Sequence, residues 1–90
     1  MPVLFSTSIL PLFRQRDIAC MTGQSFPIND YAFMSNATGD ADYPDHANAR
    51  HVYARLTGTE KPQMPPDNAG KWSPTNLALY LQWMTDGFNK

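Results

Sequence analysis

The sequence predicts an all-α domain: a small bundle of three to four helices joined by long ordered loops. Three segments place helix-capping residues around apolar side chains at helical spacing. No segment alternates apolar and polar residues over a useful strand length, and no internal repeat occurs. Hydrophobic residues make up 42% of the 90-residue chain, near the globular average, so we expect one folded domain over residues 1–90.

The clearest helix signal lies at the C-terminal end, over residues 73–87. Ser73 is a good N-cap, and Pro74 suits the first helical position, where its missing N–H is not needed. Gly87 fits a left-handed C-cap. The apolar stripe follows the i, i+3, i+4, i+7 pattern and consists of Leu77, Tyr80, Leu81 and Met84, with Leu79 and Trp83 widening it.

A second helix is expected from Pro44 to about Thr57. Asp42 or Tyr43 would cap it, and Gly58 would end it. Its apolar stripe consists of Ala49, Val52, Tyr53 and Leu56.

An N-terminal helix is expected between Ser8 and Met21. Pro11 and Asp17 are its two candidate break points. Asp17 is also the candidate cap of a second piece that Gly23 would close.

Two loop regions separate these helices. Residues 24–42 carry turn signals, with a single helical turn expected at residues 31–34. Residues 59–71 are rich in proline, and we expect proline stiffness and the packing of Met64 to order them.

Composition excludes several classes of partner. Seven Lys and Arg oppose eight Asp and Glu without a basic run, so we expect no nucleic-acid binding. The apolar start lacks a basic region and is interrupted by Pro11 and Arg14, so we expect no membrane insertion. Cys20 is the single cysteine, which favours a reducing compartment and a cytoplasmic location.

Catalytic motifs are absent from the sequence. It has no nucleophile elbow and no glycine-rich phosphate loop, and nothing beside Cys20 would activate its thiol. We therefore expect a protein that is not an enzyme, although an oligomer that encloses a pocket stays an open alternative.

The two histidines raise the question of a metal site. His46 and His51 lie five residues apart, about 140° around a helix, whereas a two-histidine site prefers i, i+4. The neighbouring run Asp40, Asp42 and Asp45 lacks the glycine and glutamate of a calcium loop. Surface histidines are the favoured interpretation, and a metal site is the alternative, with the candidate ligands Asp42, Asp45, His46 and His51.

Two separated segments resemble small bacterial c-type cytochrome domains. Residues 9–21, Ile-Leu-Pro-Leu-Phe-Arg-Gln-Arg-Asp-Ile-Ala-Cys-Met, look like the helix that leads into the haem-attachment motif of that family. Residues 64–74, Met-Pro-Pro-Asp-Asn-Ala-Gly-Lys-Trp-Ser-Pro, with the helix to Gly87, resemble the loop of the axial methionine and the final helix. The resemblance covers about half of the chain and implies a cytochrome-c-like helical bundle.

The chain departs from that family at the haem-attachment motif. The family needs Cys-x-x-Cys-His, but residues 17–21 read Asp-Ile-Ala-Cys-Met, with one cysteine and no histidine. Met64 takes the place of the axial methionine without a partner ligand, so we expect a haem-free domain with no cofactor. The side chains expected to fill the vacated volume are Phe26, Tyr31, Phe33, Met34 and Trp72.

A capped helical fold without catalytic machinery points to a binding role. We expect a non-catalytic accessory or protein-interaction domain that docks on a larger enzyme, an oxidative one among the candidates, or that forms a homo-oligomer. The expected interaction residues are Met64, Pro65, Pro66, Trp72 and Phe88, on an exposed loop around Met64 and an exposed tail. The alternative is a small-ligand or metal-binding domain that uses the vacated haem site.

Overall fold

The final helix, α4 (Pro74–Thr85), forms where the sequence predicts it. The computed structural model describes residues 3–61, 63–64 and 71–90. Ser73 Oγ accepts a hydrogen bond from the Asn76 N–H at 3.1 Å, and Gly87 takes a left-handed φ of +109° just beyond the helix. The predicted apolar stripe is wrong at one position, because Leu81 is 47% exposed while Tyr80 and Trp83 are fully buried.

The helix α3 (Ala47–Thr57) begins three residues later than predicted, so Pro44 lies outside it. Neither Asp42 nor Tyr43 caps it. Both of their N–H groups instead donate to Asp40 Oδ1, at 2.9 and 3.0 Å, which folds the segment into a turn. His46 takes the N-cap position with a left-handed φ of +48°, so the chain turns sharply just before the helix.

The predicted end of α3 is confirmed. Gly58 follows the helix with φ +87°, a conformation that glycine adopts without steric cost.

The N-terminal region is split, as predicted, but neither break falls at the predicted points, Pro11 and Asp17. It forms η1 (Phe5–Ile9), η2 (Leu10–Leu12) and α1 (Gln15–Gly23). Pro11 lies within η2, and the extended residues Phe13 and Arg14 separate η2 from α1. Asp17 is not the cap of α1 but its third residue, where its carboxylate accepts the Arg14 N–H at 3.0 Å and pairs with the Arg14 guanidinium at 2.7 Å.

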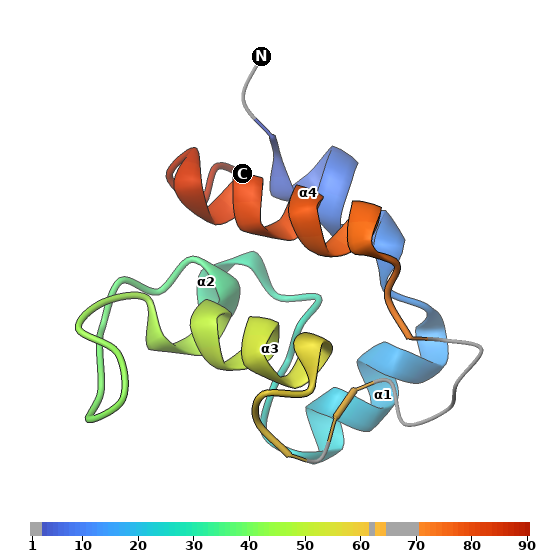
Figure 1. The fold of residues 1–90 in the computed structure, drawn as a ribbon, viewed down its shortest axis with the longest axis horizontal. Coiled ribbons are helices and arrows are strands. Elements are labelled where there is room, and N and C mark those ends of the chain that lie inside the picture. Colours follow the sequence, from blue (N-terminus) through green and yellow to red (C-terminus); the bar gives the residue numbers. More distant parts are fainter. Residues whose placement is uncertain (1–2, 62, 65–70) are drawn as a thin grey trace.

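The single turn α2 (Tyr31–Met34) is also confirmed, with the Asp30 side chain accepting the Ala32 N–H at 3.1 Å. In Figure 1, α3 and α4 run one above the other, η1 packs on α4, and α2 packs on α3. The described segments near the two ends of the chain meet, because the Phe5 N–H donates to the Asn89 carbonyl at 2.9 Å. The Cα radius of gyration, 12.0 Å, is that of a compact chain of this length.

The core is made of large side chains from both halves of the chain. It is centred on Phe5, Ile9, Met34, Val52, Tyr80 and Trp83. The Tyr80 hydroxyl donates to the Ala49 carbonyl at 2.8 Å and so joins α4 to α3. In the described part of the chain, no helix has the length and apolar character needed to cross a bilayer.

Candidate functional site

The expected interaction residues that the structure describes do not form an exposed surface. Met64, Trp72 and Phe88 are only 2%, 9% and 6% exposed, so the prediction of an exposed Met64 loop and tail is wrong for these side chains. Phe88 is buried because it stacks on the His46 ring at 3.8 Å and meets Trp83 at 5.2 Å, whereas Trp72 packs on Phe13. Pro65 and Pro66 lie outside the described residues.

Met64 lies beside the end of α1, close to Cys20. The Gln24 side-chain amide donates to both Cys20 Sγ, at 3.6 Å, and Met64 Sδ, at 3.7 Å. The Arg55 guanidinium orients that amide by donating to Gln24 Oε1 at 2.8 Å. Met64 and Cys20 are therefore neighbours in space, joined through Gln24.

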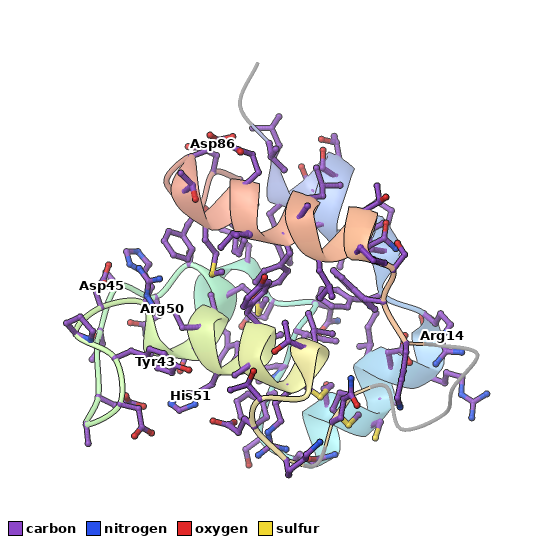
Figure 2. The ribbon with its side chains drawn as sticks, in the orientation of Figure 1. Arg14, Tyr43, Asp45, Arg50, His51 and Asp86 are labelled. Atoms are coloured by element: carbon purple, nitrogen blue, oxygen red, sulfur yellow. The ribbon has the colours of Figure 1, made fainter. Side chains whose placement is uncertain are left out.

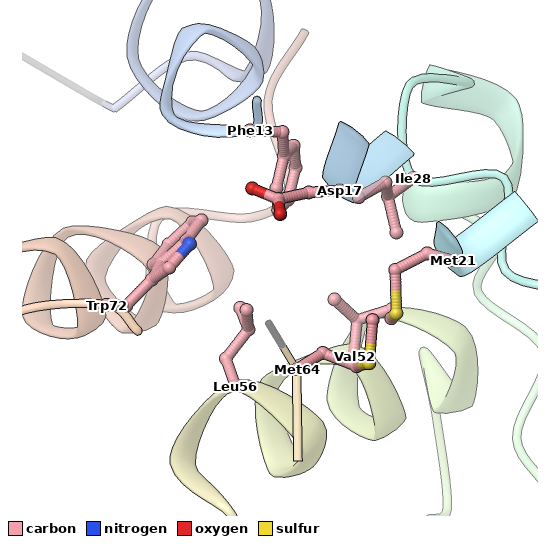
Figure 3. A pocket seen from close by; sticks show the side chains of 8 residues that line it. All are labelled: Phe13, Asp17, Met21, Ile28, Val52, Leu56, Met64 and Trp72. Atoms are coloured by element: carbon pink, nitrogen blue, oxygen red, sulfur yellow. The ribbon is translucent and has the colours of Figure 1, made fainter. Parts of the chain in front are cut away.

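A small cavity lies between Met64 and α1, and Figure 3 shows the eight side chains that line it. The cavity measures about 10 Å³, room for at most one water molecule. Of the side chains expected to fill a vacated haem volume, Trp72 lines this cavity, whereas Phe26, Tyr31, Phe33 and Met34 do not. The other lining side chains are Phe13, Asp17, Met21, Ile28, Val52, Leu56 and Met64.

The candidate metal ligands separate into two groups. Asp45 pairs with His46 at 2.9 Å and with Arg50 at 3.1 Å. His51 instead faces Asp40 and Asp42, with Nε2 to Oδ2 distances of 2.6 and 3.7 Å. The structure thus unites Asp42 and His51 with Asp40, which was not among the predicted ligands, and it places Asp45 and His46 in a different cluster.

His51 holds two loops to α3 through both of its ring nitrogens. Nε2 meets Asp40, and Nδ1 lies 2.6 Å from Glu60 Oε1, an arrangement we name the His51 clamp. Ionised carboxylates only accept hydrogen bonds, so both of these hydrogen bonds form together only when the imidazole is protonated on both nitrogens and carries a positive charge. In that form neither nitrogen is available as a general base.

Hydrogen bonds within and around the His51 clamp favour the charged forms of its three groups. Burial opposes the charged form of His51, but hydrogen bonds to Glu60 and Asp40 outweigh it, so the pKa of His51 is raised. The His51 hydrogen bond lowers the pKa of Asp40. Burial opposes the ionised Glu60 carboxylate, but hydrogen bonds from Arg55 and His51 outweigh it and lower the Glu60 pKa.

A surface groove lies between α3 and α4, beside the His51 clamp. It measures about 330 Å³, and the exposed Leu81 stands on its α4 side. Its lining comes from both helices and from the two clamped loops, and consists of Tyr43, Arg50, Tyr53, Ala54, Thr57, Thr59, Leu81 and Met84. Figure 2 shows Tyr43 and Arg50 on the same side of the molecule as His51.

Sequence reasoning missed this groove, although one signal for it was present. Leu79 and Trp83 widen the apolar stripe of the last helix beyond what one face of a short helix buries. Of the apolar residues of this stripe, Leu81 is the one that stays exposed at the groove.

The groove offers an apolar lining, hydroxyl groups and one guanidinium. Among protein-family models, curated proteins and solved structures, no match to this chain is found. The groove and the His51 clamp are therefore the features on which a function can be based.

Proposed function

We propose that this chain is a non-catalytic protein-interaction domain, accessory to a larger enzyme, and that its partner docks in the α3–α4 groove. The observation that carries the proposal is the groove itself, about 330 Å³ in size, with a half-exposed leucine beside an apolar floor. Single exposed apolar side chains are ordinary on protein surfaces. Leu81 differs because it lines a concave site beside Met84 and Tyr53.

The shape of the groove favours an anchoring side chain from a protein over an enclosed small molecule. Its volume is at the lower end of the range for small-molecule sites, about 300–1,000 Å³. Protein partners commonly insert one large side chain into such a depression, and that contact then supplies much of the binding energy.

The haem-free relationship to small c-type cytochrome domains is part of this proposal. Two observations support it: Met64 lies beside the end of α1, and the cavity there has no room for a macrocycle. In this proposal the ancestral cofactor site has become core, and binding has moved to the opposite side of α3.

The test compares two exposed leucines. Leu81→Asp places a charge on the groove, whereas Leu4→Asp makes the same change at a residue 36% exposed outside it. We expect Leu81→Asp to weaken partner binding about tenfold to 100-fold, from the lost apolar burial, while Leu4→Asp retains it. Binding is measured with the partner purified after capture from the native host, and equal affinity of both variants would contradict the proposal.

A second candidate function, binding of a divalent cation, is favoured by one observation. Ligand atoms of Asp40, Asp42 and His51 all lie within 4.8 Å of one another. Glu60 orients His51 through Nδ1, so a cation would replace the proton on Nε2. Zinc titration by calorimetry tests this: stoichiometric uptake that Asp42→Asn removes supports it, and no heat of binding contradicts it.

A further inference from the structure

We infer that the segment seated in the α3–α4 groove presents a large apolar side chain next to a carboxylate. The apolar side chain would lie on Tyr53, Leu81 and Met84, and the carboxylate would pair with Arg50. This inference rests on the proposed function, because it names the chemistry of the partner at the same site.

Arg50 is held in position with part of its guanidinium unused. Its Nε donates to the Asp45 carbonyl at 2.9 Å, and its Nη2 donates to Asp45 Oδ1 at 3.1 Å. These bonds occupy the side edge of the guanidinium, while Nη1 makes no hydrogen bond with the described residues. The end edge, with one N–H on each terminal nitrogen, matches the two oxygens of a carboxylate.

The charges around the groove favour an anion over a cation. Among the described residues that line it, Arg50 is the only charged one. Two carboxylates next to the lining are already paired, Asp45 with Arg50 and His46, and Glu60 with His51 and Arg55. A cationic partner would therefore find no carboxylate among the described lining residues.

The apolar part of the groove suits a large side chain. The Tyr53 ring is stacked on the buried Tyr80 ring at 5.6 Å, which makes a firm floor. Met84 is an adaptable neighbour for a side chain of irregular shape. The hydroxyls of Tyr43 and Tyr53 make no hydrogen bond to any described residue, so both are free to meet the polar backbone of a bound segment.

Two blocked peptides test the inference: acetyl-Ala-Phe-Glu-Ala-amide and the same peptide with Gln in place of Glu. Binding is followed by NMR through the methyl signals of Leu81 and Met84. We expect the Glu peptide to bind about threefold to fivefold more tightly, the value of one partly exposed ion pair. The preference should vanish in Arg50→Gln and persist in Arg16→Gln, a matched change at an exposed arginine on α1.

If Arg50→Gln fails to fold, the carboxylate preference is tested on the unmodified protein by a second measurement. In the unmodified protein, the preference for the Glu peptide should shrink as salt is raised, while binding of the Gln peptide stays unchanged.

The outcomes separate the two proposals. If both peptides shift the groove signals with equal affinity, the carboxylate inference is overturned and the docking groove stands. If neither shifts them at millimolar concentration, the groove fails as a docking site together with the inference. If N-acetylphenylalanine matches the Glu peptide, the occupant is a small amphiphilic acid, which overturns the assignment to a partner segment.

Discussion

The two faces of α3 meet very different surroundings. On one face, Val52 and Leu56 close against Met64 and Trp72 around a cavity of about 10 Å³. On the other face, Arg50, Tyr53 and Thr57 line an open groove of about 330 Å³. One side of this helix is therefore closed core, and the other borders open space.

The largest expected effect tests whether the closed face is core. Met64→Ala removes a side chain that is 2% exposed, so we expect it to lower the free energy of unfolding by about 2–5 kcal/mol. Leu81→Ala, on the open face, should lower it by less than about 1 kcal/mol. Urea denaturation of both variants measures the difference, and equal losses would break the contrast between the faces.

A smaller loss of stability is expected from a substitution in the loop that contains Tyr43, a groove-lining residue. A side chain at Gly39 would collide with the backbone carbonyls of Pro44 and Tyr43, so Gly39→Ala should destabilise by about 1–3 kcal/mol. Gly23→Ala is the matched control, because a methyl group there meets nothing within 4 Å. Thermal unfolding compares the two, and an equally stable Gly39→Ala protein would show that this loop is not tightly held.

The smallest effect concerns the pH dependence of the His51 clamp. The raised pKa of His51 means that its contribution is complete below its unfolded value, 6.5, and is lost as pH rises through the folded value. The lowered pKa values of Asp40 and Glu60 mean that their contributions hold above their unfolded values, 3.8 and 4.5, and are lost as pH falls below them. The clamp should therefore stabilise most between about pH 4.5 and pH 6.5.

The measurement compares the free energy of unfolding of the unmodified protein with that of His51→Gln. The difference should be larger at about pH 5.5 than at about pH 8.5. His46→Gln serves as the control at the other histidine. A difference that stays constant with pH would show that His51 does not bridge the two carboxylates as an imidazolium.

Local signals account for what the sequence predicts well. The end of α3 at Gly58 and both ends of α4 depend on residues adjacent to each terminus, so their positions can be read directly. The start of α3 could not be read this way. There the His46 N–H donates to the Ala37 carbonyl, nine residues earlier in the chain, and that contact moves the first turn away from Pro44.

The candidate site was less predictable because it joins distant segments. His51 meets Asp40 and Glu60 from two loops, and the groove needs α3 and α4 side by side. The burial of Phe88 has the same origin, since its partner His46 lies forty-two positions away in the chain. Such pairings leave no periodic mark in the sequence.

The contact of Phe5 with Trp83 and Asn89 has a consequence for the synthesis of the chain. Phe5 packs on Trp83 at 5.5 Å, and its N–H bonds to the Asn89 carbonyl. A nascent chain exposes Phe5 and Ile9 until the residues near position 89 have left the ribosome, so the core closes only after translation of this segment. During that interval the growing polypeptide presents an apolar stretch to which a chaperone can bind.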